Sequence, residues 1–255
     1  MFKNKKRFLR IIFSITILTL SFSSLISEET IAVGNKLLKE IDRNLSPESF
    51  ESLRKIINIE PNGTKKEFVL YALKKGNDKM VTTFLAPKSE VGRSTLRLDE
   101  NMWLFIPNVG RAMRITSLQS VIGGIFNNSD IMKLDYTAEY NVTEMIDIKG
   151  EKLLTLTAKT SSVAYDKLKM WVNTKYNTPS KIECYTSSEM LIKTLYFKEI
   201  KDFGHGIKRP SVLETDSPLH KGYKAVMIYA NIAPRKIADE VFTVDYMDKI
   251  KDLRK

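Results

Sequence analysis

Turn signals recur at short intervals through most of this 255-residue chain, and their spacing limits the fold more than any other feature. They are clusters of Gly, Pro, Asn and Asp, such as Pro61-Asn62-Gly63 and Gly76-Asn77-Asp78. Runs of about 8 to 15 residues rich in Val, Ile, Thr, Tyr and Phe lie between them, which is typical of hairpin-connected strands. The expected strands cover residues 49–60, 64–75, 78–86, 92–98, 101–107, 111–116, 151–160, 166–174, 180–188, 192–202, 207–215 and 223–232.

Helical spacing is confined to the two ends of this strand-rich region. Apolar residues recur with helical period over residues 30–45, and Ser46-Pro47 is expected to end that helix. Residues 245–254 predict a short C-terminal helix, and residues 117–148 an irregular insertion with a short helix capped by Ser129. We therefore predict a single domain over residues 28–255, built on a long antiparallel meander.

Several predicted strands are apolar on both faces, including residues 68–73, 195–197 and 225–230. A sheet with one face in water alternates apolar and polar residues, so a second layer must cover these strands. One solution is a two-layer sandwich or helices on both sides, and periodicity alone favours it. The other is a curved sheet whose concave side holds helices and an apolar ligand.

The first 27 residues have the layout of a secretory signal peptide. Five basic residues and no acid occupy residues 1–10, and residues 11–27 carry no charge before Glu28-Glu29. We expect cleavage after Ser27, with Ser24 as the second choice. The alternative is an uncleaved anchor, for which the run is short and diluted with Ser and Thr.

The net charge of +11 gives little support to nucleic-acid binding. Without residues 1–27 the chain has 36 basic against 30 acidic residues, which leaves +6. The remaining basic residues are scattered lysines rather than clustered arginines with interleaved aromatics, so we expect no nucleic-acid partner. A mildly basic exported protein can still approach an anionic membrane surface.

The residue types needed for catalysis or metal binding are scarce. A single cysteine, Cys184, and two histidines exclude a disulfide framework and a multi-cysteine metal site. No nucleophile, phosphate-loop or zinc-protease motif occurs, and residues 202–206 are interpreted as a hairpin corner with His205 at the surface. We predict no catalytic residue, no metal and no cofactor, and interpret Cys184 as a small buried hydrophobe.

The most specific pattern lies in residues 84–135. Ala86-Pro87 and Gly92 precede the run Met102-Trp103-Leu104-Phe105-Ile106-Pro107, which turns into Arg111-Ala112-Met113-Arg114-Ile115; Ser129-Asp130 and Asp135 follow. This pattern resembles the LolA-like family of outer-membrane lipoprotein-sorting proteins. Phe105 stands where that family usually has Tyr, and Asn128 and Ile131 stand where it has Gly and Phe.

The resemblance implies both a fold and a role. The implied fold is mainly β, an incomplete antiparallel β-barrel with helices covering an apolar concave cavity. The implied role is that of a periplasmic carrier, which accepts lipoproteins or lipids from an inner-membrane transporter, holds their acyl chains and delivers them to the outer membrane through transient membrane contact. In better-known members an arginine helps to keep the lid closed, and neither Arg111 nor Arg114 maps onto it.

The candidate cavity residues are apolar side chains of this pattern and its neighbours. They are Phe84, Leu96, Leu98, Trp103, Phe105, Met113, Ile115, Phe126 and Trp171. Arg111 and Arg114 are candidates for the cavity rim or for a partner contact. Core packing is the alternative interpretation for the aromatic residues, and a solvated strand face for the arginines.

Two other functional classes stay open. The first is an envelope sensor, a lipid-binding regulatory module that acts through a protein partner and usually carries a second domain, for which this chain has little room. The second is a secreted hydrolase or an outer-surface structural protein. Co-purifying lipid would favour the carrier over this last class.

Overall fold

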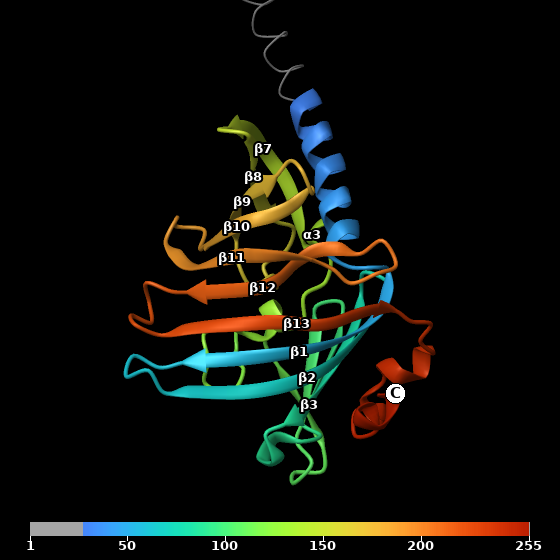
Figure 1. Cartoon of the computed structure of the whole chain (residues 1–255). Coiled ribbons are helices and arrows are strands. Elements are labelled where there is room, and N and C mark those ends of the chain that lie inside the picture. The colour runs from blue at the N-terminus through green and yellow to red at the C-terminus, as the bar shows by residue number, and fades with distance from the viewer. Residues whose placement is uncertain (1–27, 255) are drawn as a thin grey trace, which may run out of the picture.

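The computed structural model describes residues 28–254, so the expected signal peptide, residues 1–27, lies outside them. In the described part, thirteen strands form one antiparallel sheet in the order β6-β5-β4-β3-β2-β1-β13-β12-β11-β10-β9-β8-β7. The two edge strands β6 and β7 are not paired with each other, so the sheet is an open half-barrel (Figure 1). This confirms the prediction of a mainly β fold with an incomplete antiparallel barrel.

The strands are joined mostly by short turns, as the spacing of turn signals predicts. They are β1 (Ser49–Ile59), β2 (Lys65–Lys75), β3 (Lys79–Ala86), β4 (Ser94–Leu98), β5 (Asn101–Phe105), β6 (Ala112–Ile115), β7 (Tyr140–Ile148), β8 (Glu151–Ala158), β9 (Lys167–Asn173), β10 (Thr178–Tyr185), β11 (Leu191–Asp202), β12 (Lys208–Asp216) and β13 (Lys224–Pro234). A single 3-10 turn, η1 (Lys88–Glu90), separates β3 from β4. The tripeptide Asp202-Phe203-Gly204 begins the β11–β12 corner with His205 exposed, as expected.

Strand β7 corrects the prediction that residues 117–148 are irregular throughout. Only Tyr140 and Val142 of this strand are buried, and the residues between and after them are largely exposed. A polar edge strand that pairs only with β8 lacks the apolar alternation on which sequence reading depends.

The N-terminal helix is described over residues 28–45 and ends before Ser46-Pro47, as predicted. Leu37, Leu38, Ile41 and Leu45 are buried in the inner core of the half-barrel. Side-chain hydrogen bonds from Asn44 to the carbonyls of Tyr176 and Asn177, 3.1 and 3.2 Å long, hold the helix to the β9–β10 turn. The helix therefore covers one end of the concave side (Figure 1).

Residues 117–139 complete the layer on the concave side and contain two short helices, α2 (Asn128–Ile131) and α3 (Tyr136–Glu139). The N-cap of α2 is Asn127 rather than the predicted Ser129. The Asn127 side chain accepts from the backbone N–H of Asp130, and the Asp130 carboxylate accepts from the backbone N–H of Asn127, which forms a capping box. We refer to residues 28–45 and 117–139 together as the cover.

The C-terminal segment forms a second layer on the outer face. It consists of three 3-10 turns, η2 (Asp239–Phe242), η3 (Val244–Tyr246) and η4 (Ile250–Leu253), and not of the single helix predicted over residues 245–254. Extended backbone at Thr243 separates the first two turns. Val241, Phe242, Met247 and Ile250 pack on the outward side chains of β2–β4, and this tertiary packing overrides the local helical pattern.

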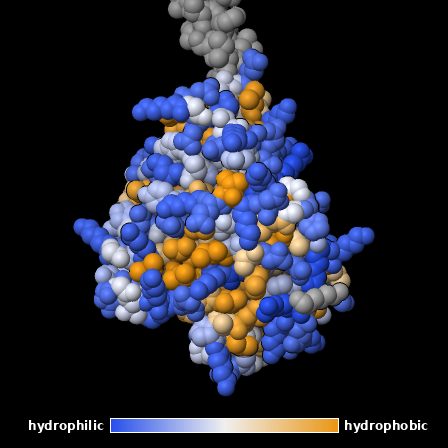
Figure 2. All heavy atoms as spheres, in the orientation of Figure 1, coloured by the Kyte–Doolittle hydropathy of each residue, from blue (hydrophilic) through white to orange (hydrophobic). Residues whose placement is uncertain are grey.

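These two layers account for the strands that are apolar on both faces. In β2, Phe68, Leu70 and Ala72 belong to the inner core, whereas Tyr71 and Leu73 pack under the C-terminal segment. The outward residues of β1 and β13, among them Ile57, Val226 and Ile228, are only half-buried. Figure 2 shows apolar surface over these strands.

Removal of the Phe242 ring should destabilise the whole fold, because this side chain is 3% exposed in the outer core. For Phe242→Ala we expect a loss of about 3–5 kcal/mol in the free energy of unfolding, measured by urea denaturation. Val244→Ala, in the same segment but 39% exposed, is the control and should change stability by about 0.5 kcal/mol or less. Equal effects of the two substitutions would mean that the segment does not contribute a core.

Candidate functional site

Five basic side chains point from the inner face of the sheet into the cover. They are Arg54, Lys74, Arg97, Lys193 and Arg209, on β1, β2, β4, β11 and β12, and none is more than 6% exposed. Arg54 lies inward because β1 alternates, with Phe50, Ser52, Ile56 and Asn58 on the same side. Each of the five donates hydrogen bonds to the cover.

Three of these basic side chains form buried ion pairs with acids of the cover. The pairs are Lys74–Asp135 at 2.6 Å, Lys193–Asp130 at 2.8 Å, and Arg97–Glu139. A buried pair contributes little net stability, but removal of one partner leaves an uncompensated charge. These pairs therefore fix the position of the cover on the sheet.

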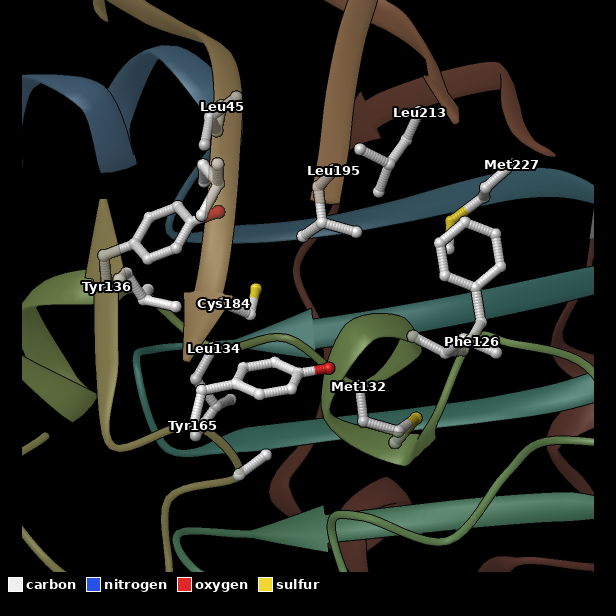
Figure 3. Close-up of a cluster of buried hydrophobic side chains, with 14 of the residues drawn as sticks. Leu45, Phe126, Met132, Leu134, Tyr136, Tyr165, Cys184, Leu195, Leu213 and Met227 are labelled. Atoms are coloured by element: carbon white, nitrogen blue, oxygen red, sulfur yellow. The ribbon is translucent and has the colours of Figure 1, made fainter. Parts of the chain in front are cut away.

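Asp130 is the centre of the densest polar network in the cover. Besides Lys193, its carboxylate accepts from the Tyr165 hydroxyl at 2.9 Å. Lys193 Nζ also donates to the carbonyl oxygen of Ile125 at 2.6 Å. Figure 3 shows the Tyr165 hydroxyl directed toward Met132, at the end of α2. Asp130 is thus an anchor for the loop.

A second acid, Asp42, joins the two parts of the cover. Its carboxylate, on the N-terminal helix, accepts from the backbone N–H of Tyr136 at 2.7 Å and from the backbone N–H and hydroxyl of Thr137 at 2.9 and 2.7 Å. Burial raises the pKa of Asp42, and the nearby charge of Asp135 raises it further, against the lowering effect of these hydrogen bonds.

Arg54 and Arg209 form no ion pair with any carboxylate of residues 28–254. Arg54 donates through Nη1 to the carbonyl oxygen of Ile131 at 2.8 Å, and Arg209 donates through Nη1 to that of Leu45. Their guanidinium carbons lie 5.0 and 4.3 Å from the centre of the Tyr229 ring. Two buried guanidinium groups therefore contact the same aromatic ring.

The charges around Tyr229 alter its acidity. Burial alone would raise the pKa of its phenol, but the positive charges of Arg54 and Arg209, with a hydrogen bond from Arg209, outweigh burial and lower it. Burial also lowers the pKa of Arg54, and the neighbouring charge of Arg209 acts in the same direction. The site is therefore a buried region of positive potential.

A cavity of about 80 Å³ lies between the sheet and the cover. Arg54, Arg209 and Tyr229 line it together with apolar residues, and Figure 3 shows Leu134, Cys184, Leu195 and Leu213 around this space. The volume is room for a few water molecules, well below the roughly 300–1,000 Å³ of ligand pockets. The structure is therefore a closed form. Burial raises the pKa of the Cys184 thiol far above its usual value, so this cysteine is an unreactive part of the wall.

A second cavity, of about 310 Å³, lies beside the Arg97–Glu139 pair, and both polar and apolar residues line it. Leu134 and Glu139 belong to the walls of both cavities. A movement of residues 134–139 would therefore change the two spaces together.

The predicted cavity residues are divided between the two faces of the sheet. Phe84, Phe126 and Ile115 belong to the inner core, and Met113 lies inward on the edge strand β6 but is 37% exposed. Leu96, Leu98, Trp103 and Phe105 lie on the outer face under the C-terminal segment, and Trp171 lies outward with the Lys181 ammonium 3.6 Å from the centre of its ring system. None of the nine lines the 80 Å³ cavity.

The two predicted rim arginines lie away from the cavity. Arg111 precedes β6 and is exposed. Arg114 lies on the outer face of β6, 4.9 Å from the centre of the Trp103 ring system, and donates to the Asn101 side chain at 2.6 Å. Arg111 therefore lies outside the strand that carries Arg114.

The sequence reading missed Arg54, Arg209 and Tyr229. The sequence does contain a signal for Arg54. An arginine on the same side of a strand as Phe50 and Ile56 must either be buried with them or end the apolar side of the strand. Arg209 likewise lies on the same side of β12 as Ser211 and Leu213. An inward charge in a strand is a stronger indicator of a site than an aromatic residue in a motif.

Two searches of the described residues gave negative results. Within residues 28–254 no group of three or more His, Cys, Asp or Glu is placed to hold a metal ion. No helix in that part of the chain has the length and apolar character needed to cross a membrane.

Lys193→Met should destabilise the protein strongly, because it leaves Asp130 charged and buried without its basic partner. We expect a loss of about 3–5 kcal/mol in the free energy of unfolding, measured by chemical denaturation at neutral pH. Lys198→Met, on the same strand but exposed and paired with Glu214, should cost about 1 kcal/mol or less. If the two substitutions cost the same, the buried pair does not anchor the cover.

Tyr229 should be the first buried tyrosine to ionise as the pH is raised, because the neighbouring charges lower its pKa. Ultraviolet absorbance should detect tyrosinate formation below the usual tyrosine pKa of about 10, and Tyr229→Phe should remove that step. Arg209→Gln should move it to higher pH. Tyr136→Phe is the control, since burial holds the pKa of Tyr136 well above the usual value. An early step that survives in Tyr229→Phe would contradict this assignment.

Comparison with known proteins shows the family to which these features belong. No curated protein matches the chain. A family model described as "Uncharacterized protein" matches residues 76–249, which is more than half of the sequence.

This chain aligns with nearly the whole length of several solved structures that have the same fold. A LolA superfamily protein from Nitrosomonas europaea is 28% identical with a TM-score of 0.74, and the match covers 83% of this chain and 97% of that one. A DUF1329 family protein from Desulfovibrio piger is 19% identical with a TM-score of 0.73, covering 86% and 99% of the two chains. A putative outer membrane lipoprotein-sorting protein domain from Vibrio parahaemolyticus is 17% identical with a TM-score of 0.70, covering 87% and 99%.

At 19% and 17% identity, the Desulfovibrio piger and Vibrio parahaemolyticus structures show the fold alone. The LolA superfamily protein, with 28% identity and a TM-score of 0.74, belongs to the same family that the motif of residues 84–135 resembles. The chain thus belongs to the family of uncharacterized proteins whose model it matches, and it is LolA-like.

Proposed function

We propose that this protein is a periplasmic carrier that binds the acyl chains of lipoproteins or lipids inside the half-barrel and moves them from the inner to the outer membrane. The observation that carries the proposal is the construction of the concave side. It has an apolar core and a small cavity, and directional polar contacts tie its cover to the sheet. The likeness to a LolA superfamily protein at 28% identity supports this proposal.

An apolar concave face is sufficient to hold lipid without catalytic groups. Each buried CH₂ contributes about 0.8 kcal/mol, so even part of an acyl chain binds firmly. The 80 Å³ cavity of the closed form cannot accept such a chain, so loading requires movement of the cover. Phe84 and Ile115 on the sheet and Phe126 in the cover, all in the inner core, would then contact the chain.

The contacts of the cover suit reversible opening. Hydrogen bonds from Arg54 and Arg209 reach carbonyl oxygens at the ends of α2 and of the N-terminal helix. Such bonds, with a charged donor, exchange for water at a net cost of about 1.5–3 kcal/mol each. A membrane or a partner protein could therefore shift the balance between closed and open forms.

The carrier role sets the other features that we propose. Residues 1–27 export the chain, and residues 28–255 act as one domain. An inner-membrane transporter supplies the cargo, the mildly basic surface makes transient membrane contact, and the protein is a binding protein rather than an enzyme, without metal, cofactor or nucleic acid.

The first test is mass spectrometry of organic extracts from the protein purified natively from a bacterial periplasm, together with binding of a fluorescent acyl probe. We expect stoichiometric acyl lipid or saturable probe uptake. Ala164→Phe, which fills the cavity wall with a ring, should weaken probe binding about tenfold, the equivalent of two lost CH₂ contacts.

Ala32→Phe is the matched control, because Ala32 is exposed on the N-terminal helix and the substitution adds the same ring. Circular dichroism confirms that both variants fold. Absence of both co-purified lipid and probe uptake in the unaltered protein would refute the carrier proposal.

A further inference from the structure

The acids that line the cavity between sheet and cover already have partners. Asp130 and Asp135 are paired with Lys193 and Lys74, and Glu139 with Arg97. Asp42 accepts three hydrogen bonds from residues 136 and 137. No carboxylate of the cavity wall therefore remains to compensate Arg54 and Arg209.

Arg54 and Arg209 each use only some of their guanidinium N–H groups in hydrogen bonds. A guanidinium carries five N–H groups. The structure gives Arg54 two acceptors, the Ser52 hydroxyl at 3.0 Å and the Ile131 carbonyl. It gives Arg209 the carbonyls of Pro210 and Leu45, and the Tyr229 hydroxyl. All of these acceptors are neutral, so the positive charges stay uncompensated although Arg54 is 4% and Arg209 6% exposed.

Buried charges without counter-charges are costly, and a protein that keeps two of them on a cavity wall has a use for them. Guanidinium groups match carboxylate and phosphate oxygens in geometry as well as in charge. Apolar side chains, among them Leu45, Leu134, Leu195 and Leu213, line the same cavity. One wall thus offers an oxyanion site next to space for a hydrocarbon chain.

We propose that Arg54 and Arg209 together bind the oxyanion, a carboxylate or a phosphate, of an acyl-chain amphiphile, so that the cargo is an anionic lipid. This inference rests on the proposed function, since it specifies the head group of a ligand whose chain the half-barrel holds. Lys133, which also lines the cavity, adds a third positive charge near the site.

Anion binding would also act on the cover. The same two guanidiniums donate to Ile131 in the loop part of the cover and to Leu45 at the end of the N-terminal helix. A charged acceptor forms hydrogen bonds about twice as strong as those of a neutral carbonyl. An anionic head group therefore competes for the bonds that hold the closed form, and a neutral one does not.

The test compares ligands that differ only in charge. Binding of dodecanoate, dodecyl phosphate and the neutral dodecanol to the purified protein is measured by calorimetry. We expect at least one of the two anions to bind about tenfold or more tightly than dodecanol. The carboxylate and phosphate ligands separate a fatty-acid source of the anion from a phospholipid-type source.

Variants then assign the effect to the two arginines. Arg54→Gln and Arg209→Gln should each reduce anion affinity about tenfold and leave dodecanol affinity within about threefold. Arg93→Gln, which removes the same charge at a turn where Arg93 pairs with Glu90, is the matched control and should change neither. In the unaltered protein, bound anion should also raise the pH at which Tyr229 ionises, a readout that does not depend on the folding of any variant.

Equal affinity for the anions and dodecanol, with no change in Tyr229 ionisation, would overturn the anion site and leave the carrier in place. Loss of anion and alcohol binding to the same extent in the glutamine variants would also overturn it. Failure of all three ligands to bind would refute both the carrier and this inference.

Discussion

Five inward basic side chains hold the half-barrel to its cover, and the architecture of the concave side depends on them. A cation taken out of water must find acceptors, and short helices and loops supply them as free carbonyls and acids. Lys74, Arg97 and Lys193 use acids of the cover, whereas Arg54 and Arg209 use only neutral acceptors. The polar contacts thus set the orientation and position of the cover on the sheet, above a shared apolar core.

The two faces of the sheet are covered by different physical means. On the outside, Phe242, Met247 and Ile250 bury apolar side chains, and exposing them would cost their full transfer free energy. On the inside, the cover also has apolar contacts, but hydrogen bonds and ion pairs that water can replace fix its position. The outer segment is thus held mainly by apolar burial, whereas the inner cover is held by apolar burial and by directional polar contacts.

The spacing of turn signals was sufficient to predict twelve strands of an antiparallel meander, because each strand carries its own boundaries. The open half-barrel came from the family resemblance, since periodicity alone favoured a two-layer sandwich or helices on both sides. It was not sufficient for β7, whose polar edge position hides its period, or for the C-terminal turns, which take their shape from the sheet beneath. For the site, the motif residues Trp103 and Phe105 could not be assigned to a face, because a strand apolar on both sides does not indicate which side is concave. Arg54 was assignable in principle, since its inward neighbours mark the side.

A fold shared at 28% identity or less does not fix the cargo, so selectivity must reside in particular side chains. The cavity wall combines leucines with two guanidiniums that lack counter-charges. A purely apolar ligand would satisfy the leucines and leave both charges buried against neutral acceptors, while a small anion would leave the apolar wall in contact with water. Only a molecule with a hydrocarbon chain and an oxyanion satisfies both parts of the wall, and its anion competes for the same donors that keep the cover closed.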